Sequence, residues 1–386
     1  MKEAAALAAA GYEVSFIYNF WAEWGLPFDE KIKKDNPTIN WIMAGADPTN
    51  SKVAYNFSRL GHKYYRWLNK QFPKNISFAK QATIRGFSGL AKKALKMEAG
   101  LYVAHNLGAL PVAATAAKKY NSKYAFDAED YHRGQSTKGS LEYITTLLLE
   151  DAYLPGTSYI TAASPLIGEQ YTKHYQKRVT VINNVFSLKY LAKEIKEPSK
   201  PLKLFWFSQT IGKGRGLEDI ILALKEMPAG EFSLTLLGNY DESIKKYFSE
   251  LGRNGNQQVD IKFLHPVSAG EIFEIAAQHD IGLALETGKD ENNKLALSNK
   301  IFTYLLAGNA IIFSETKAQY NFYLENSKIG HIYKTGNIVA LKKILFSYLN
   351  NLNVLQKKKE DSFKLGSEKF NWEIEYRKFI EIVDAL

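Results

Sequence analysis

The chain has 386 residues, of which 46% are hydrophobic, and a formal net charge of +10. This length predicts two domains with sizeable cores, and the lack of cysteine excludes disulfides and thiolate metal sites while remaining compatible with a reducing compartment. No apolar run reaches the roughly 20 residues that a membrane-spanning helix needs, so we expect a cytoplasmic protein.

Strand-like runs alternate with helical patterns along the whole chain. The first residues, MKEAAALAAAGYEV, predict an amphipathic helix that leads into a strand, and they do not resemble a signal peptide. A chain of this type normally begins with a strand and a glycine-containing loop, so we expect the N-terminal sheet to lack its first strand. The predicted strands are YEVSFIYN, TINWIMAG, LYVAHN, YAFDAED, YITAAS and VTVINN in the first half, and KLFWFSQ, SLTLLGN, DIKFLH, IGLALE and AIIFSE in the second. The helical patterns between them indicate parallel, doubly wound α/β sheets.

The two series of strands are separated by the polar stretch LAKEIKEPSKPLK, which is the predicted linker. We therefore expect an N-terminal domain at 1–195 and a C-terminal domain at 196–365. The remaining residues, 366–386, predict one more amphipathic helix.

The segment from Ser51 to Met97 has eleven Lys or Arg residues, eight interleaved aromatic residues and no Asp or Glu. A basic, aromatic-rich pair of helices suits an anionic membrane surface or a lipid-linked acceptor. The same pattern is compatible with nucleic acid, or with a solvated helix pair whose aromatic rings face the core. We expect peripheral attachment to the inner face of the membrane and no nucleic-acid partner.

The stretch 282–313 predicts a buried strand, a polar loop, a helix and a second buried strand. Glu286 ends the first strand, and Ser298, Asn299 and Lys300 open the helix. In a parallel α/β sheet, ligands bind beyond the carboxyl ends of the strands. Free N–H groups and the dipole of a helix start attract a phosphate or diphosphate, while a nearby carboxylate accepts hydrogen bonds from sugar hydroxyls.

A glycine-rich turn follows the strand KLFWFSQ and runs from Gly212 through Lys213, Gly214 and Arg215 to Gly216. Glycines let the backbone approach a phosphate, and the two cations can neutralise it. On its own, such a turn is often only a tight turn.

The helix at 299–308 reads NKIFTYLLAG, which resembles the N-K-x-x-E-Y-x-x-A-G helix of retaining glycosyltransferases of the GT-B fold, especially family 4. The resemblance implies two doubly wound Rossmann-like domains that face a cleft, and a C-terminal helix that crosses back to the N-terminal domain. Arg215 and Gly216 match a family element that stabilises the departing nucleoside diphosphate. Thr303 departs from the pattern, because the family more often has a glutamate that holds the ribose there. Gln209 stands where an arginine is common.

The resemblance also implies a role for other strand ends. His105 resembles the histidine of the family's A-H-D or A-H-N element, although a lone strand-end histidine is equally compatible with a structural role, and the same holds for His265. Glu129 stands where relatives have the histidine of a D-A-H-E sequence, with His132 three residues later. We interpret three residues as catalytic, namely Glu286, His105 and Glu129. The predicted diphosphate-binding residues are Gly212, Lys213, Arg215, Ser298, Asn299 and Lys300. The predicted base-binding residues are Gly238, His265 and Val267.

The resemblance predicts a hexosyltransferase-like enzyme that moves a sugar from a UDP- or GDP-sugar to an acceptor with retention of anomeric configuration. It implies no metal and no other cofactor, and an acceptor that is a polysaccharide, a lipid-linked or another glycan precursor. One alternative is a GT-B sugar-nucleotide epimerase. The other is a degenerate, non-catalytic GT-B protein, which the residues Thr303, Glu129 and Gln209 and the missing first strand favour.

Overall fold

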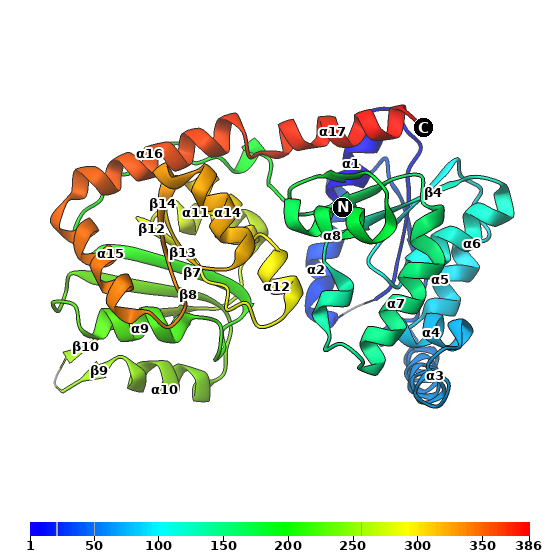
Figure 1. Ribbon diagram of the computed structural model, residues 1–386, viewed down its shortest axis with the longest axis horizontal. Coiled ribbons are helices and arrows are strands. Elements are labelled where there is room, and N and C mark those ends of the chain that lie inside the picture. Colours follow the sequence, from blue (N-terminus) through cyan, green and yellow to red (C-terminus); the bar gives the residue numbers. More distant parts are fainter. Residues whose placement is uncertain (21, 50, 256) are drawn as a thin grey trace. The chain divides into compact units, whose positions relative to one another are not determined.

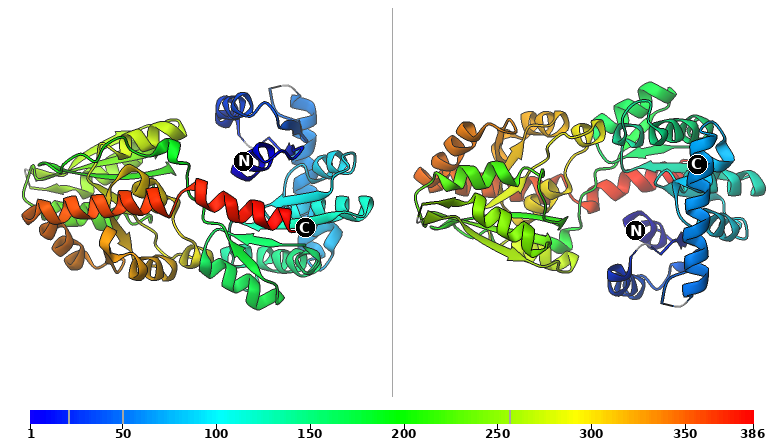
Figure 2. Two further views of the ribbon diagram at one scale, coloured as in Figure 1. Left: turned by 90° about the horizontal axis from the view of Figure 1, so that it is seen from above. Right: turned by 90° about the horizontal axis from the view of Figure 1, so that it is seen from below.

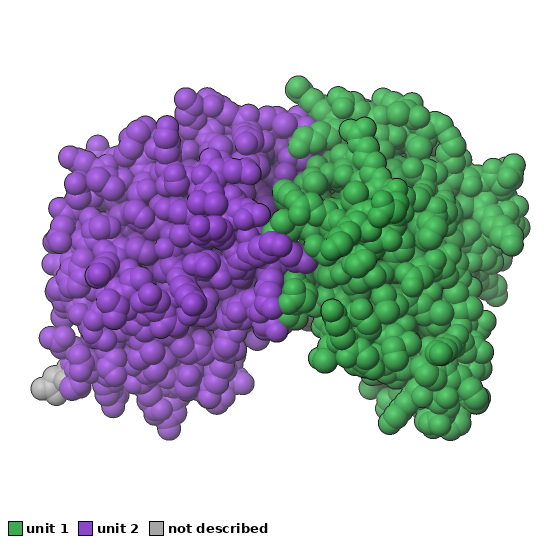
Figure 3. Space-filling view, in the orientation of Figure 1, with its two compact units in different colours: residues 1–182, 290–292, 376–386 green, residues 183–289, 293–375 purple. Residues whose placement is uncertain are grey.

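The computed structural model describes residues 1–20, 22–49, 51–255 and 257–386. The chain folds into two compact units, which comprise residues 1–182, 290–292 and 376–386 (unit 1) and residues 183–289 and 293–375 (unit 2) (Figure 3).

The boundary between the units lies after Ile182, earlier than the predicted position after residue 195. Val185 is fully buried in a hydrophobic cluster of unit 2, and Asn183 Nδ2 donates to Glu375 Oε1 at 2.9 Å, so this segment belongs to unit 2. The last helix, α17 (Trp372–Asp384), begins in unit 2, while residues 376–386 belong to unit 1. The predicted crossing of the C-terminal helix is thus confirmed.

Unit 1 contains two parallel sheets, β1–β2 and β3–β4–β5–β6. The strands are β1 (Ser15–Tyr18), β2 (Asn40–Met43), β3 (Leu101–His105), β4 (Lys123–Ala128), β5 (Ile160–Ala162) and β6 (Val179–Val181). The helices are α1 (Lys2–Ala9), α2 (Leu26–Asp35), α3 (Lys52–Gln71), α4 (Ile76–Thr83), α5 (Phe87–Ala94), α6 (Leu110–Tyr120), α7 (Leu141–Tyr153) and α8 (Pro165–Tyr175). All six predicted strands are confirmed, but their division between two sheets was not predicted.

The basic segment 51–97 forms three helices, α3, α4 and α5, and not the expected pair. The chain breaks after α3, and Asn75 then caps α4 by accepting hydrogen bonds from Ser77 N and Phe78 N at 3.0 and 3.2 Å. Gly86, with a φ of +81°, precedes α5 in the left-handed region that glycine favours. Two local stop signals therefore divide what the composition presents as one basic block.

Unit 2 contains a six-stranded parallel sheet in the order β11–β8–β7–β12–β13–β14 (Figure 1). The strands are β7 (Leu202–Thr210), β8 (Phe232–Asn239), β11 (Asp260–Leu264), β12 (Ile281–Ala284), β13 (Ala310–Ser314) and β14 (Gly330–Tyr333), with a separate antiparallel pair, β9 (Arg253–Asn254) and β10 (Gln257–Gln258). The helices are α9 (Leu217–Lys225), α10 (Glu242–Leu251), α11 (Ala269–Ala276), α12 (Glu291–Leu295), α13 (Asn299–Ala307), α14 (Lys317–Glu325), α15 (Ile338–Asn350) and α16 (Leu352–Glu368). The five strands predicted here are confirmed, whereas β14 and the two-residue strands β9 and β10 were not predicted.

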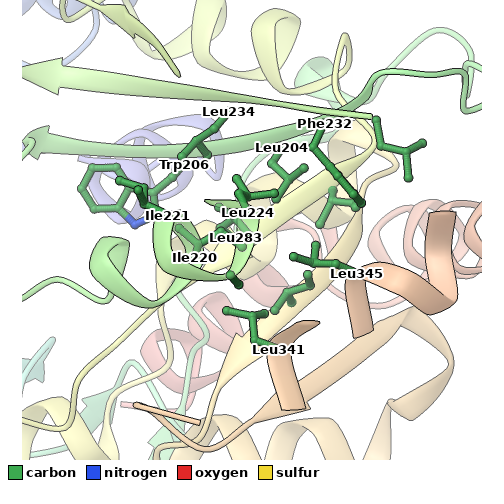
Figure 4. Close-up of a cluster of buried hydrophobic side chains, with 14 of the residues drawn as sticks. Leu204, Trp206, Ile220, Ile221, Leu224, Phe232, Leu234, Leu283, Leu341 and Leu345 are labelled. Carbon is green, nitrogen blue, oxygen red and sulfur yellow. The ribbon is translucent and has the colours of Figure 1, made fainter. Parts of the chain in front are cut away.

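Side chains alternate across the unit 2 sheet, so both of its faces are buried. Leu204 and Trp206 of β7 pack against α9 and α15 on one face (Figure 4). Phe205, between them, packs into a second cluster with residues of α11 and α13 on the other face. A parallel sheet covered by helices on both faces requires such continuous apolar strands.

The strand order places a topological switch point between β7 and β12. From β7 the chain adds β8 and β11 on one side, and then β12, β13 and β14 on the other. Ligands of open α/β sheets bind at the carboxyl ends of the strands beside such a point. The segments that follow β7 and β12 are the two polar elements that the sequence identifies, at 212–216 and 286–300.

Candidate functional site

Glu286 lies just beyond the carboxyl end of β12 and is surrounded by hydrogen-bond donors from its own segment. Its carboxylate accepts from Asn293 Nδ2 at 2.9 Å, from Ser298 Oγ at 2.8 Å and from Lys300 Nζ at 3.1 Å. Its backbone N–H donates to Ser314 Oγ at 2.6 Å, which ties the loop to the end of β13. The predicted proximity of Glu286, Ser298 and Lys300 is therefore present in the structure.

The surroundings of Glu286 keep its carboxylate ionised. Burial alone raises the pKa of this carboxyl, but the Lys300 ammonium and the hydrogen bonds from Asn293 and Ser298 outweigh burial and hold the pKa below its usual value. A carboxylate has about four acceptor positions. Ser298 and Lys300 both use Oε1 and Asn293 uses Oε2, so among the described residues one position on Oε2 is left for a ligand hydroxyl.

Helix α13 begins at this cluster without a side-chain cap. Ser298 occupies the N-cap position and its hydroxyl donates to Glu286, but its oxygen accepts no hydrogen bond from the first helical turn. The N–H groups of that turn therefore lack their usual side-chain acceptor. Together with the helix dipole, such N–H groups attract an anion. Thr303 lies one turn later, is 1% exposed, and its Oγ1 donates to Asn299 O at 3.4 Å. This turn therefore supplies no carboxylate for a ribose.

The glycine-rich turn packs directly against the strand that leads to Glu286. Gly216 has a φ of +80°, and a Cβ at this position would lie 3.1 Å from Leu285 Cβ. The guanidinium of Arg215 lies 5.6 Å from the centre of the Trp206 ring, and Lys300 Nζ lies at the same distance from that ring. Both cations therefore approach one indole ring.

Trp206 was not singled out in the sequence, where it is one residue of an apolar strand. Its ring is fully buried, and within the described ranges its Nε1 has no hydrogen-bond partner. The remaining polar groups of the glycine turn point elsewhere. Lys213 Nζ lies 3.9 Å from the centre of the Tyr247 ring on α10, and Gly214 N donates to Glu218 Oε1 at 2.9 Å. At Gly212 a Cβ would meet nothing within 4 Å, so this end of the turn is open.

The base-binding candidates lie at the carboxyl ends of β8 and β11. Gly238 is required for packing, because a Cβ there would lie 2.5 Å from Ser208 O. The exposed His265 ring stacks on Tyr240, with 4.7 Å between the ring centres and 9° between their planes. The Val267 side chain packs against a hydrophobic cluster. Tyr240 and His265 thus form a flat aromatic surface, of which the sequence identified only the histidine.

A second polar cluster lies in unit 1, where His105 ends β3. Its Nε2 lies 3.2 Å from Glu3 Oε2, and its Nδ1 lies 3.1 Å from Asp127 Oδ2 and 3.6 Å from Glu129 Oε1. The register of β3 and β4 pairs His105 with Asp127, and Thr161 on β5 donates to Asp127 Oδ1 at 2.7 Å. Glu3 comes from α1 and was not predicted, because nothing in the local sequence links it to β3.

The carboxylates around His105 stabilise its protonated form. Burial lowers the pKa of this imidazole, but Asp127, Glu129 and Glu3 together raise the pKa well above its usual value. Because both ring nitrogens face carboxylates, His105 has no free nitrogen with which to accept a proton. Glu3, His105 and Asp127 each offer one ligand atom, all within 4.8 Å of one another, so they could hold a metal ion only if His105 released a ring proton.

The loop that follows β4 is fixed by hydrogen bonds within unit 1. Asn292 Oδ1 accepts from Tyr131 N at 2.7 Å, and Asn292 Nδ2 donates to Asp130 Oδ1 at 2.8 Å. Glu129 has a side chain that is 48% exposed, whereas His132 is buried beside Phe126. Of these two residues, Glu129 is accessible to a ligand and His132 is not.

Comparison with known proteins identifies the fold. No family profile and no curated protein matches this sequence. Among solved structures, sucrose-phosphate synthase from Thermosynechococcus elongatus is similar, with 13% identity and a TM-score of 0.69 over 100% of this chain and 91% of that one. HepE from Anabaena in complex with UDP-glucose has 13% identity and a TM-score of 0.68 over 100% and 94%. A glycosyltransferase from Rickettsia africae has 16% identity and a TM-score of 0.63 over 99% and 92%. These neighbours are GT-B glycosyltransferases, and the chain described above has the same fold, an α/β architecture of two Rossmann-like domains.

Proposed function

We propose that the protein is a glycosyltransferase that transfers a hexose from a nucleotide-sugar donor. The observation that carries this proposal is the ionised Glu286, which lies beside the uncapped start of α13 and retains one acceptor position. A carboxylate next to an anion-binding helix start matches a ligand that has sugar hydroxyls at one end and a diphosphate at the other. Structural neighbours such as HepE have been solved with UDP-glucose, which supports this class of donor.

In the proposed complex, the diphosphate lies near the N–H groups of Asn299 and Lys300, with Arg215 as the second cation. Glu286 accepts a hydrogen bond from a hydroxyl of the transferred sugar through Oε2. The base lies near the flat surface of Tyr240 and His265, where base–aromatic stacking would contribute. Lys213, held over Tyr247, stays a weaker candidate for the diphosphate.

We propose transfer with retention of anomeric configuration and without a metal ion, as the resemblance to family 4 implies. The bond between the anomeric carbon and the β-phosphate oxygen breaks, and the acceptor oxygen forms its bond on the same face of the sugar. The departing phosphate oxygen takes the acceptor proton. Arg215 and Lys300 then stabilise the negative charge that develops on the leaving diphosphate, which is the largest electrostatic demand of the reaction.

We assign the acceptor, a glycan or lipid-linked glycan precursor, to unit 1. Glu129 is the exposed carboxylate of the His105 cluster and would accept a hydrogen bond from the acceptor. His105 would orient Glu129 and is not itself a proton acceptor, because both of its nitrogens face carboxylates.

Thr303 supports a second candidate function, that of a degenerate transferase. It is buried and provides no carboxylate for the ribose, so donor affinity would depend on the base, diphosphate and sugar contacts without one to the ribose.

Calorimetric titration of the full chain with UDP and GDP, followed by a hydrolysis assay over a panel of nucleotide sugars, tests both functions. Binding with slow donor hydrolysis supports the enzyme, and binding without any turnover supports the degenerate protein. No binding of either nucleotide would refute the enzyme.

A further inference from the structure

Helix α3 exposes an apolar stripe that a soluble helix normally buries. Its large apolar side chains are 54–70% exposed: Val53, Phe57, Leu60, Tyr64 and Trp67, followed just after the helix by Phe72 at 55%. The first five are spaced three or four residues apart, so they lie along one side of the 20-residue helix. An apolar stripe of this length on a solvent-facing helix indicates a surface that another phase or molecule covers.

The cations of α3 lie along one edge of this stripe. Lys52, Arg59, Lys63, Arg66 and Lys70 are all exposed. Their spacing places them roughly 100° around the helix from the apolar stripe, and all on the same side of it. Because residues 51–97 contain no Asp or Glu, the segment offers no carboxylate to neutralise them.

The opposite side of α3 is attached to the rest of unit 1. Asn69 is buried and its Nδ2 donates to Thr145 Oγ1 at 2.8 Å, and His62 Nε2 lies 2.9 Å from Ala82 O. The Tyr55 ring contacts the Arg85 guanidinium, 4.5 Å from its centre. The stripe therefore faces outward, and α3 runs along the outer edge of unit 1 (Figure 2).

We propose that the outward face of α3, defined by Val53, Phe57, Leu60, Tyr64 and Trp67 with their cationic edge, docks on an anionic lipid bilayer. The apolar stripe would enter the boundary between headgroups and acyl chains, and the cations would contact lipid phosphates. Tyr64 and Trp67 have the amphipathic rings that favour this depth. A nucleic acid would neutralise the cations but leave the apolar stripe in water, so the lipid surface fits both features.

Docking through the α3 face does not depend on the proposed reaction, because none of the residues of this face belongs to the candidate donor site.

Within the basic segment 51–97, the proposal assigns the membrane contact to α3 alone. In α5, Phe87 and Leu90 are buried in a hydrophobic cluster, so the aromatic and apolar residues of 87–94 belong to the core of unit 1.

Co-sedimentation with vesicles tests the proposal on the full chain. Wild-type protein should bind phosphatidylglycerol–phosphatidylcholine vesicles and not pure phosphatidylcholine vesicles. The variant K63Q/R66Q/K70Q should bind the anionic vesicles about 100-fold more weakly, as expected for three cations at an anionic surface. The variant F57S/W67S should lose at least about tenfold, because two large side chains no longer leave water.

Matched variants separate the α3 face from net charge and bulk hydrophobicity. K118Q/K138Q/K173Q removes three exposed cations elsewhere in unit 1, and L324S/V339S removes two exposed apolar side chains of unit 2. Both should retain wild-type vesicle affinity. Unchanged thermal unfolding and UDP affinity in each variant would show that the units remain folded and would report on the donor site separately.

Three results would overturn the proposal. The first is a wild-type protein that does not bind anionic vesicles. The second is loss of binding in the matched variants equal to that of the α3 variants. The third is binding of a DNA or RNA oligonucleotide that is tighter than vesicle binding and that F57S/W67S leaves unchanged.

Discussion

The Glu286 cluster of unit 2 and the His105 cluster of unit 1 are built from the same kinds of group, but they differ in how many hydrogen-bonding positions they leave for a ligand. Each places a carboxylate and a cation at the carboxyl end of a parallel strand. Around Glu286 the donors leave one acceptor position unused and a helix start without a cap. Around His105 the carboxylates face both ring nitrogens, so the hydrogen-bonding capacity of the imidazole is used within the cluster.

A polar cluster is therefore a candidate site when its internal hydrogen bonds leave some donors or acceptors for a ligand to contact. The Glu286 cluster meets that condition, with Arg215 and Lys300 near the ring of Trp206 as additional charge. In the His105 cluster only Glu129, with a side chain that is 48% exposed, meets it.

The largest expected effect separates the two carboxylates. Glu286→Ala should lower kcat/KM for sugar transfer by about 1,000-fold, because a preorganised contact to the reacting sugar is lost. Glu129→Ala should lower it by about tenfold, as for one hydrogen bond to an acceptor. Steady-state kinetics with the donor found in the panel provides the measurement, with Glu315→Ala, an exposed carboxylate at the end of β13, as the control. Equal losses in Glu286→Ala and Glu129→Ala would remove the distinction between the clusters.

A smaller effect tests which cation of the glycine turn serves the donor. Arg215→Ala should weaken UDP binding by about 1.5–3 kcal/mol, the usual contribution of a charged hydrogen bond. Lys213→Ala should change it by less than about 0.5 kcal/mol, because the ammonium lies over Tyr247. Calorimetry on the two variants checks both values. The reverse ranking would assign the diphosphate to Lys213 and contradict the arrangement around Trp206.

The parts of the site that the sequence predicts are those built from one continuous segment. Glu286, Ser298 and Lys300 lie within 15 residues, and the strand, loop and helix between them follow from local periodicity and capping. The eleven predicted strands are confirmed, and the local signal is clearest for β12 and β13, whose residues are all buried, as expected for central strands of a parallel sheet.

The parts that were missed depend on contacts between distant segments. Glu3 of α1 contacts His105 at the end of β3, although the two residues are far apart in the sequence. Trp206 lies within an apolar strand, so nothing beside it in the sequence marks it as part of a site. The division of the unit 1 strands into two sheets is likewise a matter of pairing between segments, which periodicity does not encode. The exposure of the α3 stripe could not be predicted either, because the periodicity of a sequence identifies the apolar side of a helix but not what covers that side.

The smallest expected effect is on the pH dependence of the unfolding free energy, which distinguishes His105, surrounded by carboxylates, from an ordinary buried histidine. The raised pKa of His105 means that the folded state binds its proton more tightly than the unfolded state, so its stabilisation is complete below about pH 6.5 and is lost as the pH rises through the raised pKa. His105→Gln should therefore cost about 1–3 kcal/mol of unfolding free energy at pH 6, and less at pH 9. His331 of unit 2 has the opposite sign, because burial lowers its pKa to about 4, so His331→Gln should improve relative stability as the pH falls below about 6.5. Urea unfolding of both variants from pH 5 to 9 measures the two slopes. A His105→Gln difference that does not change with pH would mean that the pKa of His105 is the same in the folded and unfolded states, so that its carboxylate neighbours do not stabilise the imidazolium.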